Sequence, residues 1–250
     1  MNRRTESLLL GAMGVAALLL SLNGTALAFI RPSLVPYLLA SGVVLLLLAA
    51  APAVRRRVAP DEELAAEEQT EHDHQHSRRA PWLVMAPLLV LLVVAPGPLG
   101  ASAASSAQRA VTPQDGTYPP VGPQVDGAVP MTLAEYTSRA VDDDSHSLSG
   151  VPVRLVGFVA KAKDGNGFLL SRFTIFCCAA DAEIQQVRIL GSSATLAPNT
   201  WVTVTGTWPV SSAPTGAVSD NEPIPVMTAT SVVQVKRPHA PYEYTLQYAE

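Results

Sequence analysis

The chain has 250 residues, of which 48% are hydrophobic and only 15% are charged, and its formal net charge is -4. This length allows one or two domains, but so large an apolar excess is unusual for a soluble protein. The apolar residues are also concentrated in the N-terminal part of the chain. The composition therefore predicts a membrane protein with a more polar C-terminal part.

Three stretches without charged side chains are long enough to cross a bilayer, because a helix needs roughly 20 residues to span about 30 Å of hydrocarbon. The predicted spans cover residues 7–30, 34–54 and 80–100. The third is the weakest, since its strongly apolar part is short, contains Pro87 and is followed by a sequence similar to a signal-peptide cleavage site. Residues 1–103 are thus a predicted membrane domain.

Arginines set the predicted orientation of these spans, because cytoplasmic loops of membrane proteins carry an excess of Lys and Arg. Arginines precede the first span, follow the second and precede the third, namely Arg3, Arg4, Arg55, Arg56, Arg57, Arg78 and Arg79. The N-terminus and the loop 55–79 are then cytoplasmic, and the C-terminal domain is extracytoplasmic. We expect a multi-pass protein of the cytoplasmic membrane, in contact with membrane lipid.

Small residues recur at three- and four-residue steps along the first span, at Gly11, Gly14, Ala17 and Ser21. Such a stripe allows another helix to approach closely. The neighbouring helix could belong to another membrane protein or could be the second span of this chain.

The predicted cytoplasmic loop ends in alternating histidines, His72, His74 and His76, with Asp73 between the first two. Imidazole nitrogens and carboxylate oxygens suit a borderline ion such as Zn²⁺. The pattern is also typical of a solubilising polar loop. Weak metal capture and a purely solubilising role both stay open.

Residues 104–129 are rich in Ser, Pro, Gly and Gln and predict a flexible linker. A β domain over residues 130–238 and a C-terminal tail over 239–250 follow. The domain begins with a capping box, in which Thr132 and Glu135 start a helix that should run from Leu133 to about Val141. Alternating apolar residues then predict five strands. These strands cover residues 151–160, 168–178, 183–190, 200–208 and 225–235.

A short helix and five short strands, with Gly157 and Gly206 where a strand must bend sharply, are typical of a small closed barrel of the OB type. The predicted fold class is a membrane protein with three N-terminal transmembrane helices and a C-terminal all-β, OB-like barrel preceded by a short helix. A two-sheet sandwich is the alternative. From residue 128 onward acidic residues outnumber basic ones, so we expect no nucleic-acid partner.

Both cysteines of the sequence are adjacent, and Asp181 follows three residues after the second of them. A turn could bring Cys177, Cys178 and Asp181 together as ligands for a soft or borderline metal, with His146 or His239 as a further ligand. Alternatively, the cysteines are structural or form a strained vicinal disulfide, and Asp181 caps a turn. Thiol redox chemistry is a third interpretation, although there is no CxxC motif.

Three stretches of the C-terminal part carry a resemblance to a known family, namely Arg172–Ala182, Trp201–Gly206 and Pro238–Tyr244. They resemble the YcgQ-like permease subunits, a family of bacterial membrane proteins. The N-terminal spans are similar to that family only in number and hydropathy. The resemblance implies an accessory subunit encoded beside a multi-span permease, associated in some bacteria with zinc-responsive genes.

The sequence contains no recognisable Ser/His/Asp set, phosphate loop or paired acid/base carboxylates, so we expect no enzyme. The leading hypothesis is an accessory subunit of an integral-membrane permease with an extracytoplasmic binding domain, and Zn is the candidate ligand. The alternative is a membrane-anchored thiol-redox or metal-binding enzyme that uses the vicinal cysteines.

Overall fold

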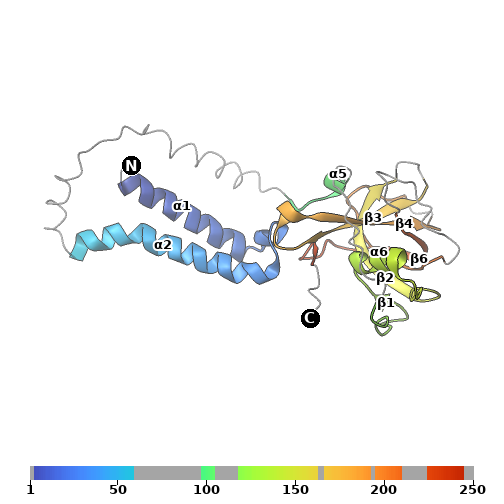
Figure 1. Ribbon diagram of the computed structural model, residues 1–250. Helices are drawn as coiled ribbons and strands as arrows, with labels where there is room; N and C mark the ends of the chain where they lie inside the picture. Colours follow the sequence, from blue (N-terminus) through green and yellow to red (C-terminus); the bar gives the residue numbers. More distant parts are fainter. Residues whose placement is uncertain are drawn as a thin grey trace. The chain divides into compact units, whose positions relative to one another are not determined.

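The computed structural model describes residues 3–58, 97–104, 118–162, 166–192, 195–209 and 224–244 (Figure 1). The chain divides into two compact units, Met1–Leu27 with Pro32–Gly97 and Ala28–Arg31 with Pro98–Glu250. The central residues of the third predicted span, together with His72, His74 and His76, lie outside the described residues.

The first unit contains helices α1 (Arg3–Leu22) and α2 (Val35–Val58), which pack as an antiparallel pair. Gly14 of α1 faces Gly42 of α2 so closely that a Cβ on Gly14 would lie 2.9 Å from the Gly42 carbonyl oxygen. A Cβ on Gly11 would lie 3.7 Å from Ala49. The small residues of the first helix therefore pack against the second helix of the same chain, which is one of the two alternatives that the sequence leaves open.

Within the part of the chain that the structure describes, one helix is long and apolar enough to cross a membrane, at Pro32–Pro52 with a mean hydropathy of 2.3. By length and composition it fits a membrane anchor or a signal sequence. The predicted length of the first span, residues 7–30, is wrong. Helix α1 ends at Leu22, so its apolar part is shorter than predicted and covers Glu6–Leu22. Gly24 then adopts a φ of 75°, the left-handed conformation that commonly follows a helix end.

Large exposed apolar side chains are concentrated on α1 and α2. They include Leu8, Met13, Val15, Leu19, Leu22, Tyr37, Val43, Val44, Leu47, Leu48 and Val54. Soluble domains rarely expose so much apolar surface on one element. The pair of helices therefore offers an apolar surface that suits lipid or another apolar partner.

The second unit is mostly sheet, with a short helix before its long strands. The described residues contain β1 (Val129–Pro130), β2 (Pro152–Lys161), β3 (Phe168–Ile175), β4 (Glu183–Leu190), β5 (Trp201–Thr207), β6 (Val226–Gln234) and β7 (Glu243–Tyr244). Helix α6 (Leu133–Asp142) lies between β1 and β2, and the one-turn helix α5 (Ala101–Ala104) precedes them. The predicted helix and the five predicted strands are confirmed, with shifts of a few residues at their ends.

The five long strands form a closed ring through their hydrogen bonds. Strand β2 is antiparallel to both β3 and β5, β3 is antiparallel to β4, and β5 is antiparallel to β6. The parallel pairing of β4 with β6 completes the ring. The short strands β1 and β7 add to β2 and β3 in parallel.

Two glycines allow strands of this ring to bend. Strand β2 pairs with β5 up to Phe158 and with β3 from Phe158 onward, so it turns at Gly157. A Cβ on Gly157 would lie 2.7 Å from the carbonyl oxygen of Ser171. At Gly206 the register between β5 and β6 shifts, and a Cβ there would collide with the Thr228 carbonyl oxygen. Both glycines stand where the sequence predicts a sharp bend.

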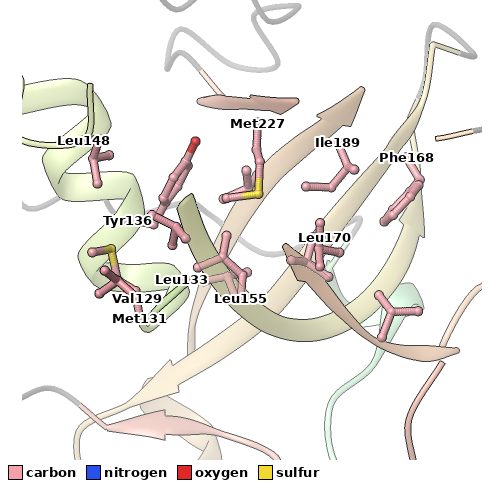
Figure 2. Packing of buried hydrophobic residues seen from close by; sticks show 14 of the residues in the cluster. Val129, Met131, Leu133, Tyr136, Leu148, Leu155, Phe168, Leu170, Ile189 and Met227 are labelled. Carbon is pink, nitrogen blue, oxygen red and sulfur yellow. The ribbon is translucent and has the colours of Figure 1, made fainter. Parts of the chain in front are cut away.

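Side chains of α6 and of the ring strands share one apolar core (Figure 2). Leu133 and Tyr136 of α6 belong to this cluster together with the strand residues Leu155, Leu170 and Met227, and all five are fully buried. The hydroxyl of Tyr136 donates a hydrogen bond of 2.9 Å to the carbonyl of a β6 residue. A second apolar core consists of Phe158, Phe173, Ile175, Ile184, Tyr242 and Ala104.

The described segment 239–244 is part of the domain, where the sequence predicts the start of a tail. Glu243 is only 5% exposed and pairs in β7 with β3. Its carboxylate accepts hydrogen bonds from the backbone N–H groups of Leu133 and Ala134, at 2.8 and 3.1 Å, and lies 3.7 Å from the guanidinium of Arg172. The two hydrogen bonds satisfy the first two free N–H groups of α6.

The segment before residue 130 also contributes to the domain, although the sequence predicts a linker over 104–129. Ala128 and Val129 are buried, and Val129 belongs to β1. The guanidinium of Arg139 donates to the carbonyl of Pro119 at 2.9 Å. Part of the predicted linker is therefore held by polar and apolar contacts that its composition does not reveal.

Candidate metal site at the Cys177–Asp181 loop

The chain leaves β3 at Ile175 and forms a loop over residues 176–182 that contains the short helix η3 (Ala179–Asp181). The sequence predicts a strand as far as Cys178, which is wrong by three residues. The reason is Asp181, whose carboxylate accepts the backbone N–H groups of Phe176, Cys177 and Cys178 at 2.9, 2.8 and 3.2 Å. Three N–H groups that converge on one carboxylate cannot also form a regular strand ladder. The capping role considered for Asp181 is thereby confirmed.

A second set of main-chain hydrogen bonds holds this loop to residues 29–31, which belong to the same unit. Ile30 and Cys178 form an isolated antiparallel bridge. The N–H of Arg31 donates to the Cys177 carbonyl at 3.1 Å, and the N–H of Ala179 donates to the Phe29 carbonyl at 2.7 Å. Sequence reasoning missed this partner, because a three-residue pairing leaves no periodic pattern in the sequence.

Cys177, Cys178 and Asp181 each offer one ligand atom, and these atoms lie within 4.8 Å of one another. Both cysteines are free thiols, so the two are not joined in a vicinal disulfide. Two sulfur atoms bound to one Zn²⁺ at about 2.3 Å each are at most about 4.6 Å apart. Small rotations of the side chains would therefore bring the three ligands onto a single ion.

The hydrogen bond from the Cys177 thiol to the Asp181 carboxylate raises the pKa of Cys177 to about 12, with a further contribution from its contact with Cys178. Burial raises the pKa of Asp181, but the Cys177 thiol and the backbone N–H groups of the loop outweigh it, so the pKa is lowered. At neutral pH the loop thus holds a neutral thiol against a carboxylate. A thiol in this state is a weak nucleophile, since the thiolate is the reactive form.

The carboxylate of Asp181 has about four acceptor positions. Three backbone N–H groups and the Cys177 thiol use them. A cation that replaces the proton of the Cys177 thiol would occupy only the acceptor position of Asp181 that this thiol uses. The three hydrogen bonds from the backbone N–H groups would stay in place. Two sulfur ligands and one oxygen ligand leave at least one open position in a tetrahedral site, which an exchangeable ligand can fill.

The other predicted ligands are not part of this group. His146 lies against the ring of Trp208, with 5.6 Å between the ring centroids, and neither His146 nor His239 belongs to the cluster of ligand atoms. The three histidines of the predicted cytoplasmic loop lie outside the described residues, so the hypothesis about them stays a prediction. Phe176, which precedes the two cysteines in the sequence, is 55% exposed to solvent.

Tyr242 is hydrogen-bonded to two segments of this unit that lie far from it in the sequence, 28–31 and 98–104. Its hydroxyl donates to the carbonyl of Ala28 at 2.8 Å and accepts from the N–H of Leu99 at 3.1 Å. Arg31 is also held, since its guanidinium lies 5.7 Å from the ring centroid of Tyr244. Segments 28–31 and 98–104 therefore both dock on the C-terminal residues of the domain.

These C-terminal residues and the cysteine loop fall within one recognised domain. Residues 132–245 match the DUF1980 C-terminal domain. The match includes the ring, the Cys177–Asp181 loop and β7, and it agrees with the resemblance noted for the C-terminal part. No curated protein and no solved structure matches the chain.

Proposed function

We propose that this protein is an accessory subunit of an integral-membrane permease and that its C-terminal domain binds a thiophilic metal ion, with Zn²⁺ as the leading candidate. The observation that carries the proposal is the convergence of Cys177, Cys178 and Asp181 within 4.8 Å on one loop. Cys177 is exposed and Cys178 is half-buried, so an ion could reach the site from solvent. A site with an open coordination position suits reversible capture and release better than a permanent structural role.

The contacts of Tyr242 support a multi-pass topology. Its hydroxyl is hydrogen-bonded to Ala28, between α1 and α2, and to Leu99, which follows the third apolar stretch. Both segments then lie on the same side of the membrane as the domain. If α2 crosses the bilayer, the chain must cross back before residue 98, and the apolar run 80–96 is available for this. The arginine distribution would place the domain outside the cytoplasm.

The strand order supports an OB-like barrel as the binding module. The ring β2-β3-β4-β6-β5 has one parallel contact, between β4 and β6, and is bent at two glycines. Barrels of the OB type bind ligands at the face of their second and third strands. The Cys177–Asp181 loop joins these two strands of the ring, β3 and β4. A membrane-anchored thiol enzyme receives less support, because the two cysteines are adjacent and do not form a CxxC motif.

The test uses the full chain, reduced and purified in detergent, with Zn²⁺ and Cd²⁺ as probes. We expect one ion per chain at the loop, with a Cd²⁺-thiolate absorption band that disappears in Cys177→Ser/Cys178→Ser. Asp181→Asn should weaken binding, because it replaces the carboxylate ligand of the ion with a neutral amide. The triple variant His72→Ala/His74→Ala/His76→Ala is the control and should retain the band. An unchanged affinity in the double cysteine variant would refute the metal site.

The permease half of the proposal needs a separate experiment. Solubilised membranes should yield the chain together with a multi-span permease when the chain carries an affinity tag. A tagged chain that is stable in the membrane yet consistently isolated alone, under mild detergent and after cross-linking, would refute the assignment as a subunit.

A further inference from the structure

The ligand loop and the connection between α1 and α2 share a small set of main-chain contacts, which we call the clasp. The clasp consists of Phe29–Arg31 and Cys177–Ala179, and the two hydrogen bonds described above form its bridge. In the sequence, residues 29–31 lie between α1 and α2, after the short helix Thr25–Ala28 and before the short helix Pro32–Leu34. The clasp is thus the point at which the candidate metal loop contacts the segment that joins the two apolar helices.

The peptide group between Cys177 and Cys178 connects the site to the clasp. Its carbonyl oxygen accepts the N–H of Arg31, and its own N–H donates to the carboxylate of Asp181. Because a peptide group is planar and rigid, its two ends cannot rotate independently. A change in the position of Asp181 or of either cysteine therefore reorients the carbonyl that holds Arg31.

From this geometry we propose that metal binding at the Cys177/Cys178 loop stabilises the clasp and so reports metal occupancy to the α1–α2 connection. The inference rests on the proposed metal function and adds a regulatory role to the same site. An ion bound to both sulfur atoms and to Asp181 restricts the loop, which fixes the Cys177 carbonyl and the Ala179 N–H in the positions that residues 29–31 require. Without the ion the clasp depends on a single bridge and opens more often.

The remaining contacts of segment 28–31 supply a fixed reference for this movement. The Ala28 carbonyl accepts from Tyr242, whose side chain is only 2% exposed. Tyr242 belongs to the C-terminal segment 239–244 and not to the loop. Opening of the clasp therefore changes the path of residues 29–31 while Ala28 stays attached to the domain.

Linkage makes the proposal quantitative. If the ion stabilises the clasp by some factor, an intact clasp must strengthen ion binding by the same factor. One hydrogen bond of the clasp corresponds to a change of roughly 2- to 10-fold. Loss of one clasp hydrogen bond should thus weaken ion binding by up to that amount, although the altered group is no ligand of the ion.

Ala179→Pro removes one such hydrogen bond, because proline has no N–H to donate to Phe29. The site tolerates proline: Ala179 is the first residue of η3, and the preceding Cys178 is extended, with φ -154° and ψ 171°. Ala179→Ser keeps the N–H and serves as the matched control. Both variants leave all three proposed ligands unchanged.

The experiment measures amide hydrogen exchange in residues 28–34 of the full chain in lipid nanodiscs, with and without Zn²⁺, and Zn²⁺ affinity by competition with a chelator. We expect Zn²⁺ to slow exchange in this segment for the unaltered chain and for Ala179→Ser. Ala179→Pro should show a reduced effect and a several-fold weaker affinity.

The outcomes separate this inference from the proposed function. If the unaltered chain binds no Zn²⁺ at the cysteines, the proposed function fails. If it binds Zn²⁺ but exchange in residues 28–34 does not change, the coupling is refuted and the metal site stands. Equal affinity in the proline and serine variants also refutes the coupling. Should Ala179→Pro fail to fold, the exchange measurement on the unaltered chain still decides the question.

Discussion

Replacement of Glu243 by glutamine should destabilise the C-terminal domain by about 3 kcal/mol, because Glu243 is the buried partner of three groups at once. Its carboxylate accepts two N–H groups at the start of α6 and lies 3.7 Å from Arg172, whose side chain is 15% exposed. Removal of one partner of a buried ion pair typically costs about 3–5 kcal/mol. Glutamine keeps the volume and one carbonyl acceptor, so we expect the lower end of that range.

Two opposing effects on Glu243 also favour the lower end. Burial raises its pKa, while Arg172 and the N–H groups of Leu133 and Ala134 lower it, and the net direction is upward. A carboxyl group with a raised pKa gives up part of its charge-dependent stabilisation. Arg172 further retains hydrogen bonds to the carbonyls of Val156, Pro241 and Ala240 after the substitution.

The assay is urea unfolding of the full chain in detergent, followed by tryptophan fluorescence in a Trp82→Phe background, so that the signal comes from Trp201 and Trp208. Asp126→Asn is the control, since Asp126 forms an ion pair of 3.6 Å with Arg154 but its side chain is 83% exposed. Exposed pairs contribute about 0–1 kcal/mol. If Glu243→Gln loses no more stability than Asp126→Asn, Glu243 does not hold α6 to the C-terminal strand as described.

Two further predictions follow from the fold. Gly157→Ala should lower the stability of the domain by about 1–3 kcal/mol, because the added Cβ would lie 2.7 Å from a backbone oxygen that cannot move away. Gly122→Ala is the control. A Cβ at Gly122 has no atom within 4 Å, so this variant should leave the melting temperature unchanged. Burial raises the pKa of Asp143, but hydrogen bonds from Ser145 and Ser147 outweigh it and lower the pKa to about 2. The ionised Asp143 carboxylate should therefore stabilise the fold fully above about pH 4, and this stabilisation should be lost as pH falls through 2. In acid unfolding, Asp143→Asn should be less stable than the unaltered chain at neutral pH. This difference in stability should vanish as pH falls from about 4 to 2.

Local patterns in the sequence predict most of the domain. The capping box places the start of α6, where Thr132 accepts the N–H of Glu135 at 3.0 Å. Alternation of apolar residues locates strands such as Trp201–Thr207, where buried and half-buried positions alternate because one side of the strand faces the core. Gly157 and Gly206 are identifiable as bends since a strand interior otherwise disfavours glycine.

The sequence does not reveal contacts that depend on distant single residues. Asp181 ends β3 early because its carboxylate attracts three N–H groups, which outweighs the strand pattern of Phe176 and Cys177. Glu243 is a charged residue that pattern reasoning assigns to the surface, yet its partners are supplied by α6 and β3. The pairing of residues 29–31 with the cysteine loop joins two segments without a shared motif.

The hydrogen bond between Ala28 and Tyr242 joins residues 214 positions apart. At a synthesis rate of about 5–20 residues per second, Tyr242 follows Ala28 by roughly 10 to 40 s. The segment between α1 and α2 is therefore made, and meets the insertion machinery, long before its binding partner exists. Residues 28–31 can therefore dock on Tyr242 only after nearly the whole chain has been made.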